Sequence, residues 1–169
     1  MFTIRPAKSS DLSAITAIYN EAILTTTATF DTEPKTDDEQ EVWFREHGPR
    51  NPVLVAEQDG TVIGWASLSQ WSTRCAYADT VEASLYIKEE FRGRGAGKKL
   101  LAGLLETGEK AGLHSVLARI ESSNKQSIHL AETLGFEPVG IMREVGKKFD
   151  KMLDVCLMQK ILINGGGVR

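Results

Sequence analysis

One short segment, with three glycines and four basic residues, constrains this chain more than any other. It runs from Arg92 to Lys99 and reads RGRGAGKK. Residues 80–87 before it alternate in polarity like a strand, and residues 97–111 after it have helical periodicity. Glycine lets the backbone turn tightly and approach a ligand closely, and the unpaired N–H groups at a helix start favour anions. A strand, a turn and a helix in this order predict an α/β protein with a phosphate-binding turn.

The spacing of the glycines shows which of the known phosphate-binding motifs this segment fits. The dinucleotide fingerprint GxGxxG would need glycine where this chain has Lys98. The P-loop GxxxxGK[ST] would need glycine in place of Arg92 and a hydroxyl in place of Lys99. The spacing that fits is [Q/R]xxGx[G/A], with Gly95 and Gly97 as its small residues. The alternative is a glycine turn that merely starts a basic amphipathic helix.

Length and composition indicate a soluble globular protein. The chain has 169 residues, 41% of them hydrophobic and 25% charged, and its formal net charge is -3, which argues against a nucleic-acid partner. No apolar run approaches the ~20 residues of a membrane span, and the N-terminus does not resemble a secretory signal. Two cysteines and three histidines without a ligand spacing predict no metal site. We therefore expect a cytoplasmic protein with no membrane partner.

Periodicity predicts an alternating order of strands and helices. An Asp59-Gly60 turn indicates a hairpin, and Thr36 with Glu39 indicates a capping box at a helix start. We expect a central mixed, mostly antiparallel twisted sheet of about seven strands flanked by helices, in one domain over 1–163. Residues 164–169 are expected to be a disordered glycine-rich tail. The strands are predicted over 2–6, 53–57, 62–68, 80–87, 115–120, 137–144 and about 152–162, and the helices over 12–22, from 36 to about 48, over 97–111 and over 124–134.

The motif Arg92-x-x-Gly95-x-Gly97 resembles the pyrophosphate-binding motif of the GCN5-related N-acetyltransferases, the GNAT superfamily, whose members hold acetyl-coenzyme A (acetyl-CoA). The resemblance extends from Ile4 to about Ile161 and implies the GNAT fold. Within the superfamily the chain is similar to the phosphinothricin and methionine sulfoximine acetyltransferases. The segments that carry this similarity include 18–20 (IYN), 27–34 (TATFDTEP), 71–77 (WSTRCAY), 120–124 (IESSN), 134–136 (LGF) and 146–149 (GKKF).

The resemblance assigns residues to the coenzyme, which would be a co-substrate without any metal. Backbone groups of the strand before the loop would pair with the pantetheine arm, and the loop would bind the pyrophosphate. Asn124 would hydrogen-bond the coenzyme, although as the first residue of a helix with Ser127 three residues later it also fits a plain N-cap. The residues so assigned are Leu85, Tyr86, Ile87, Arg92, Gly93, Arg94, Gly95, Ala96, Gly97, Lys98 and Asn124.

Acetyl transfer to an ammonium needs a base that removes a proton. Strand alternation places Glu82 opposite the apolar Val81 and Ala83, a few residues before the glycine loop. The resemblance makes Glu82 that general base, acting directly or through water. The alternative is a solvated or salt-bridged glutamate on a strand.

The chain departs in two places from the pattern of the family that it resembles. Many members carry a tyrosine, thought to protonate the leaving thiolate, where this chain has Ala131. Tyr86, Tyr77 or water could replace it, so the general acid is open. The segment 146–152 (GKKFDKM) carries extra charge and lacks the tryptophan that the family often has there, which puts the acceptor in doubt if this segment borders its pocket.

The acceptor residues also follow from the resemblance. Arg74 has a planar guanidinium that can bind two oxygens of a carboxylate or phosphinate, although a lone arginine in a loop is more often a solvated surface charge. The predicted acceptor-binding residues are Ser72, Thr73, Arg74, Glu82, Ala83 and Ser84.

The sequence therefore predicts an acetyl-CoA-dependent N-acetyltransferase, an acyltransferase, that acts on the amine of a small amino-acid-like molecule. Phosphinothricin and methionine sulfoximine or sulfone are the first candidates, and the resemblance implies a homodimer. Two alternatives stay open: an enzyme for another amine (a protein N-terminus, a polyamine or an aminoglycoside), or a catalytically silent acetyl-CoA-binding module.

Overall fold

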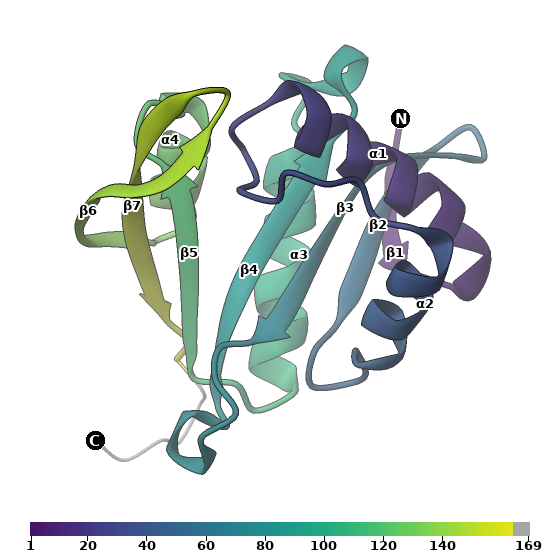
Figure 1. Ribbon diagram of the computed structural model, residues 1–169. Coiled ribbons are helices and arrows are strands. Elements are labelled where there is room, and N and C mark those ends of the chain that lie inside the picture. Colours follow the sequence, from purple (N-terminus) through teal and green to yellow (C-terminus); the bar gives the residue numbers. More distant parts are fainter. Residues whose placement is uncertain (164–169) are drawn as a thin grey trace.

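The computed structural model describes residues 1–163, and the tail predicted over 164–169 lies outside the described residues. Seven strands form one sheet in the order β1-β2-β3-β4-β5-β7-β6 (Figure 1). The strands are β1 (Thr3–Pro6), β2 (Val53–Gln58), β3 (Thr61–Gln70), β4 (Thr80–Ile87), β5 (Ser115–Glu121), β6 (Glu137–Lys148) and β7 (Lys151–Ile161). The helices are α1 (Leu12–Thr25), α2 (Asp37–Arg45), α3 (Ala96–Lys110) and α4 (Lys125–Thr133), with short 3₁₀ turns at Ser9–Asp11, Cys75–Tyr77 and Glu89–Phe91.

The predicted mixed, mostly antiparallel sheet is confirmed. Only β4 and β5 are parallel neighbours among the described strands, and the other five neighbouring pairs are antiparallel. The hairpin predicted between β2 and β3 turns at Asp59 and Gly60, whose φ angles are +50° and +76°. Positive φ at both central residues is the geometry that an Asp-Gly turn favours.

Helices cover both faces of the sheet. On one face α3 and α4 bury the larger core around Leu100, Leu104 and Met158. On the other face α1 and α2 cover a smaller core that contains Ile15 and Trp65. Each helix therefore buries one apolar stripe on the sheet, as amphipathic helices do.

The connection between α1 and α2 is fixed at both of its ends. At the α2 end the predicted capping box is present, because Thr36 Oγ1 accepts from the Glu39 amide (3.3 Å) and Glu39 Oε2 accepts from the Thr36 amide (2.8 Å). Asn20 of α1 accepts from the Lys35 amide (2.7 Å) and donates to the Lys35 carbonyl (2.9 Å). Residues 26–36 consequently cross the upper part of the sheet as a defined loop (Figure 1).

The C-terminal hairpin is longer than predicted. The prediction ended a strand at Glu144, but β6 continues to Lys148. The ladder to β7 shifts register between Met142 and Gly146, so the alternation that the prediction relied on is interrupted there. Phe149 and Asp150 close the hairpin with φ angles of +51° and +57°, without the glycine that usually marks such a turn.

Strands β4 and β5 pair over only three residues and then separate. The paired residues are Thr80 to Glu82, opposite Ser115 to Leu117. Beyond Glu82 the strand keeps its partner β3 up to Ile87 but has no ladder to β5. This separation opens the middle of the sheet (Figure 1).

Candidate active site

A cleft of about 480 Å³ lies where β4 and β5 separate. Glu82, Ser84 and Tyr86 line it from the sheet face that α1 covers, while Leu85 and Ala118 line it from the opposite face. The cleft therefore connects the two faces of the sheet. Further parts of its wall come from the loop 28–31, the start and middle of α4, and the β6–β7 hairpin: Ala28, Thr29, Phe30, Asp31, Asn124, Ser127, Leu130, Ala131, Met142, Val145 and Val155.

Glu82 forms a two-pronged ion pair with Arg119 of β5. Arg119 Nε lies 2.8 Å from Glu82 Oε2, and Arg119 Nη2 donates to Glu82 Oε1 at 2.9 Å. The side chain of Glu82 is 19% exposed and that of Arg119 is 54% exposed. The guanidinium also lies over the ring of Trp71, 5.6 Å from its centre. The predicted base is thus in the cleft wall, and the salt-bridged form that the sequence left open is the one observed.

A buried carboxylate at the end of β5 ties the loop 26–36 to α4. Glu121 accepts hydrogen bonds from the Ser123 amide (3.0 Å), from the Ser123 hydroxyl and from Thr27 Oγ1 (3.3 Å). Burial raises the pKa of Glu121, but these hydrogen bonds outweigh it and hold the pKa below its usual value. Glu121 therefore stays ionised, and its carboxylate oxygens accept hydrogen bonds from groups of the protein itself.

Aromatic rings close the cleft beside Ser84. Tyr19 donates to Asp31 and shares a hydrogen bond with Thr29 Oγ1 (3.0 Å), and its ring packs edge-on against Tyr86. Burial raises the pKa of both phenols, that of Tyr86 to about 12. The hydroxyl groups of Tyr19 and Tyr86 are therefore protonated and neutral at physiological pH.

The glycine loop has the backbone geometry that the sequence predicted. Gly93 and Gly95 have φ angles of +73° and +86°, and Gly95 is the N-cap of α3. The first helical hydrogen bond runs from the Lys99 amide to the Gly95 carbonyl. Within the described part of the chain the amides of Ala96, Gly97 and Lys98 have no acceptor, so α3 starts with three free N–H groups.

The loop is held close to the end of β4. Arg92 Nε donates to the Ile87 carbonyl at 3.1 Å, and a Cβ on Gly97 would lie 3.5 Å from Leu85 and 3.8 Å from Ile87. Arg94 stacks on Phe91 at 5.4 Å and is exposed. The free amides consequently lie next to the unpaired edge of β4.

The hydrogen-bond pattern decides which backbone groups form that edge. The Trp71 amide donates to Thr80 and the Lys88 amide donates to Ile63, so the even-numbered residues of β4 face β3 in this antiparallel ladder. The backbone groups of Leu85 and Ile87 therefore face the opening, whereas those of Tyr86 face Trp65 of β3. Tyr86 borders the cleft through its side chain.

Asn124 is the N-cap of α4, as the simpler interpretation predicted. Its Oδ1 accepts from the Ser127 amide at 3.1 Å. Both residues line the cleft, and in the described part of the chain the Nδ2 group of Asn124 has no acceptor. Capping therefore leaves one polar group of Asn124 for a ligand.

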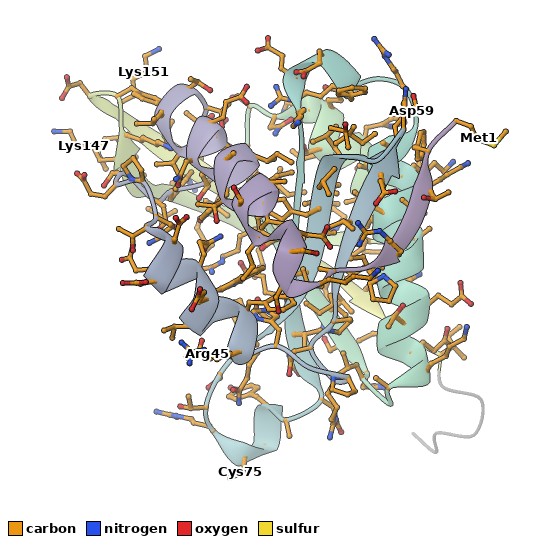
Figure 2. The ribbon with its side chains drawn as sticks, turned by 90° about the vertical axis from the view of Figure 1, so that its right-hand side faces the viewer. Met1, Arg45, Asp59, Cys75, Lys147 and Lys151 are labelled. Atoms are coloured by element: carbon orange, nitrogen blue, oxygen red, sulfur yellow. The ribbon has the colours of Figure 1, made fainter. Side chains whose placement is uncertain are left out.

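The predicted acceptor residues separate into two groups. Glu82, Ala83 and Ser84 line the cleft, but Ser72, Thr73 and Arg74 do not. Those three belong to the loop between β3 and β4, in which Thr73, Arg74 and Tyr77 are exposed. Figure 2 shows the same loop, marked by Cys75, projecting from the end of the molecule away from the hairpin tip at Lys147 and Lys151. Within one chain, Trp71 is the part of this segment that contacts the cleft wall, through Arg119.

Sequence reasoning missed three features of the cleft. Arg119, Tyr19 and Asp31 carry polar groups in its wall, yet each was read as a helix, strand or loop residue. Strand alternation places Arg119 on the same face of β5 as Leu117, but only the parallel ladder, in which Leu117 pairs with Glu82, brings it beside that glutamate. Of the segment 146–152 no residue lines the cleft, although its neighbour Val145 does. Gly146 lets the ring of Phe30 approach closely, because a Cβ on Gly146 would lie 2.3 Å from a ring atom of Phe30.

In residues 1–163 no group of His, Cys, Asp and Glu side chains is arranged to hold a metal ion. Cys75 is exposed, Cys156 is buried, and both are free thiols. None of the helices in that range has the length and apolar character of a membrane span.

Comparisons with known proteins agree with this geometry. Residues 15–136 match the sequence profile of the acetyltransferase (GNAT) family. The chain is 39% identical over 158 residues to the L-amino acid N-acyltransferase MnaT of Escherichia coli K12, covering 93% of this chain and 92% of that protein. It is 41% identical over 159 residues, with the same coverage, to an L-methionine sulfoximine/L-methionine sulfone acetyltransferase of Pseudomonas paraeruginosa. A phosphinothricin acetyltransferase of Sinorhizobium meliloti, solved with acetyl-CoA, superposes with a TM-score of 0.94 at 36% identity, covering 99% of this chain and 92% of the other.

Proposed function

Because the chain belongs to the GNAT family of acetyltransferases, we propose that it acetylates the α-amine of a small amino-acid-like acceptor with acetyl-CoA. Phosphinothricin and methionine sulfoximine or sulfone are the first acceptors to test, since similar proteins carry these names. The observation that carries the proposal is one continuous path, from the free amides of α3 along the open edge of β4 to Glu82 in the cleft.

The coenzyme half of the site would lie at the start of α3. Acetyl-CoA supplies the activated acetyl group as a thioester. Three free amides and the helix dipole favour its pyrophosphate, and Arg94 and Lys98 add exposed positive charge. The Leu85 and Ile87 edge would pair with the pantetheine arm, and a Leu85 or Ala83 amide would stabilise negative charge on the carbonyl oxygen. The residues proposed for the coenzyme are Leu85, Ile87, Arg92, Gly93, Arg94, Gly95, Ala96, Gly97, Lys98 and Asn124, with Tyr86 contributing its ring.

Glu82 is the proposed general base. It is the carboxylate that lies on β4 at the point where the strands separate, and it would take the proton of the acceptor ammonium directly or through water. Ala83 and Ser84 would contact the acceptor from the same strand. Ser72, Thr73 and Arg74 stay acceptor candidates that one chain alone does not bring to the cleft wall.

The released thiolate would take its proton from the bulk solvent, because a thiol of pKa about 8.5 is mostly protonated at pH 7. The position where many family members have a tyrosine is the buried Ala131, which lines the cleft. Burial raises the pKa of Tyr86 to about 12, well above that of a thiol, about 8.5, and Tyr77 lies outside the cleft wall. Neither phenol is therefore a favourable proton donor to a thiolate.

We further propose a homodimer of single-domain chains, 1–163, in the cytoplasm. The edge strand β6 exposes Val139 (58%) and Ile141 (62%), and an apolar edge of this kind favours association. Light scattering on the purified protein and on Ile141→Glu tests this, and a wild-type monomer would refute it.

The function is tested by following thiol release from acetyl-CoA with a panel of amines. The panel contains methionine sulfone, methionine sulfoximine, phosphinothricin, spermidine, an aminoglycoside and a peptide with a free N-terminus. The expected result is turnover of the amino-acid-like acceptors and a loss of about 10²–10⁴-fold in Glu82→Gln. Turnover of spermidine, the aminoglycoside or the peptide alone would support the alternative of an acetyltransferase for another kind of amine. Binding of acetyl-CoA without turnover of any amine would support the silent module, and full activity in Glu82→Gln would refute the base.

A further inference from the structure

We propose that Arg119 binds the anionic group of the acceptor and thereby makes the cleft selective for zwitterionic amino acids. This inference rests on the proposed function, because it names the residue that recognises one half of the acceptor. It concerns a side chain that lies 37 residues from Glu82 in the sequence and beside it in the fold.

The charges of the cleft wall point to Arg119. Among the described residues that line the cleft, three carry carboxylates, Asp31, Glu82 and Glu121, and one, Arg119, carries a permanent positive charge. Glu121 is occupied by Thr27 and Ser123. An acceptor carboxylate that enters this cleft therefore meets one cation, and its ammonium meets Glu82 directly beside it.

The ion pair is complementary to an amino acid. An α-amino acid carries its two opposite charges on adjacent carbons, so its ammonium and carboxylate lie side by side, as the Glu82 and Arg119 groups do. The acceptor can exchange one internal ion pair for two intermolecular ones, ammonium to Glu82 and carboxylate to Arg119. Guanidinium is suited to this exchange, because its planar fork binds two oxygens of either carboxylate.

Arg119 also has the freedom that the exchange requires. Its side chain is more than half exposed, and its second contact is the face of Trp71, which holds the guanidinium plane without using its N–H groups. An amine without a carboxylate leaves Arg119 bound to Glu82. A polycationic amine is additionally repelled by Arg119, which favours amino acids over polyamines and aminoglycosides.

Arg74 is the competing anion-binding residue. Its guanidinium belongs to an exposed loop and is absent from the cleft wall. The two arginines therefore make opposite predictions for the same measurement, and Arg74→Gln is the variant that tests the competing assignment.

The experiment compares L-methionine sulfone with L-methionine sulfone amide, which keeps the amine but lacks the carboxylate. The ratio of their kcat/KM values is measured for wild type, Arg119→Gln, Arg119→Lys and Arg74→Gln, and thermal unfolding confirms that each variant folds. The ratio is compared between variants, so the different reactivities of the two amines cancel. Binding of L-methionine sulfone to the CoA complex is measured by calorimetry in parallel.

We expect Arg119→Gln to lower the carboxylate preference about 10- to 100-fold, mainly through KM, with partial retention in Arg119→Lys and no change in Arg74→Gln. An unchanged preference in Arg119→Gln, or a loss in Arg74→Gln alone, would overturn the inference and leave the proposed function standing. A protein that binds methionine sulfone through Arg119 but acetylates neither acceptor would overturn the proposed function and keep the inference. If the wild-type protein neither binds methionine sulfone nor acetylates either acceptor, the inference and the proposed function are both overturned.

Discussion

Lys148 donates a hydrogen bond from Nζ to the carbonyl oxygen of Thr29 at 2.8 Å, across 119 residues of sequence. The lysine is only 5% exposed, and burial lowers its pKa. This contact fastens the loop 28–31 to the β6–β7 hairpin. Since that loop forms one wall of the cleft, the contact joins two parts of the cleft wall that are distant in sequence.

Removing this tether is expected to loosen the loop. In Lys148→Met the Thr29 carbonyl loses its donor, which costs about 1 kcal/mol and should accelerate amide exchange of residues 27–31 about fivefold. Hydrogen exchange followed by mass spectrometry measures this. Lys147→Met, on the exposed neighbour, is the control, and equal exchange in the two variants would show that the tether does not restrain the loop.

A change at Gly95 is expected to weaken coenzyme binding. Gly95 has a φ of +86°, and an L-residue in that conformation costs about 1–2 kcal/mol, so Gly95→Ala should disturb the free amides of α3 and lower the affinity for CoA at least tenfold. Gly112, at the other end of the same helix, has a φ of +81° and equally open space. Gly112→Ala should therefore lose similar stability but keep its affinity in calorimetry. Wild-type affinity in Gly95→Ala would contradict the phosphate-binding role.

The Tyr86 hydroxyl is expected to be dispensable for chemistry. Burial raises the pKa of Tyr86 to about 12, and a proton transfer to a thiolate of pKa about 8.5 would be uphill by about 5 kcal/mol. Tyr86→Phe should thus retain kcat within about twofold at saturating substrates. A loss of 10²-fold or more, with an unchanged melting temperature, would identify Tyr86 as the general acid.

His47 should make the fold sensitive to mild acid. Its ring contacts the Trp43 carbonyl (2.6 Å) and Ser69 Oγ (3.0 Å), and burial lowers its pKa from the usual value near 6.5. Between this lowered pKa and about pH 6.5 the unfolded chain therefore binds more protons than the folded one. The free energy of unfolding falls as the pH is lowered through this window, by at most about 1.4 kcal/mol per unit from this group.

Urea denaturation between pH 7.5 and 5.5 measures this slope. His47→Gln should flatten it, and His129→Gln, at an exposed position, serves as the control. Identical slopes in wild type and His47→Gln would refute the assignment.

The sequence by itself determined the local features of this protein. The alternation of β4, the Asp59-Gly60 turn, the glycine loop and the Asn124 cap follow from side-chain periodicity, from backbone conformations that glycine permits, and from hydrogen bonds between residues a few positions apart. Each of these depends on neighbours in the chain, so a single sequence is enough to predict them.

Only the tertiary structure decided how the active site is assembled. The pairing of Glu82 with Arg119, the Lys148 tether and the position of Arg74 outside the cleft wall join or separate residues that are distant in sequence. The antiparallel register with β3 likewise turns the backbone of Leu85, and not that of Tyr86, toward the opening. Sequence periodicity tells which face of a strand a side chain occupies, but the partner across the sheet is set by strand order and register, which depend on packing of the whole chain.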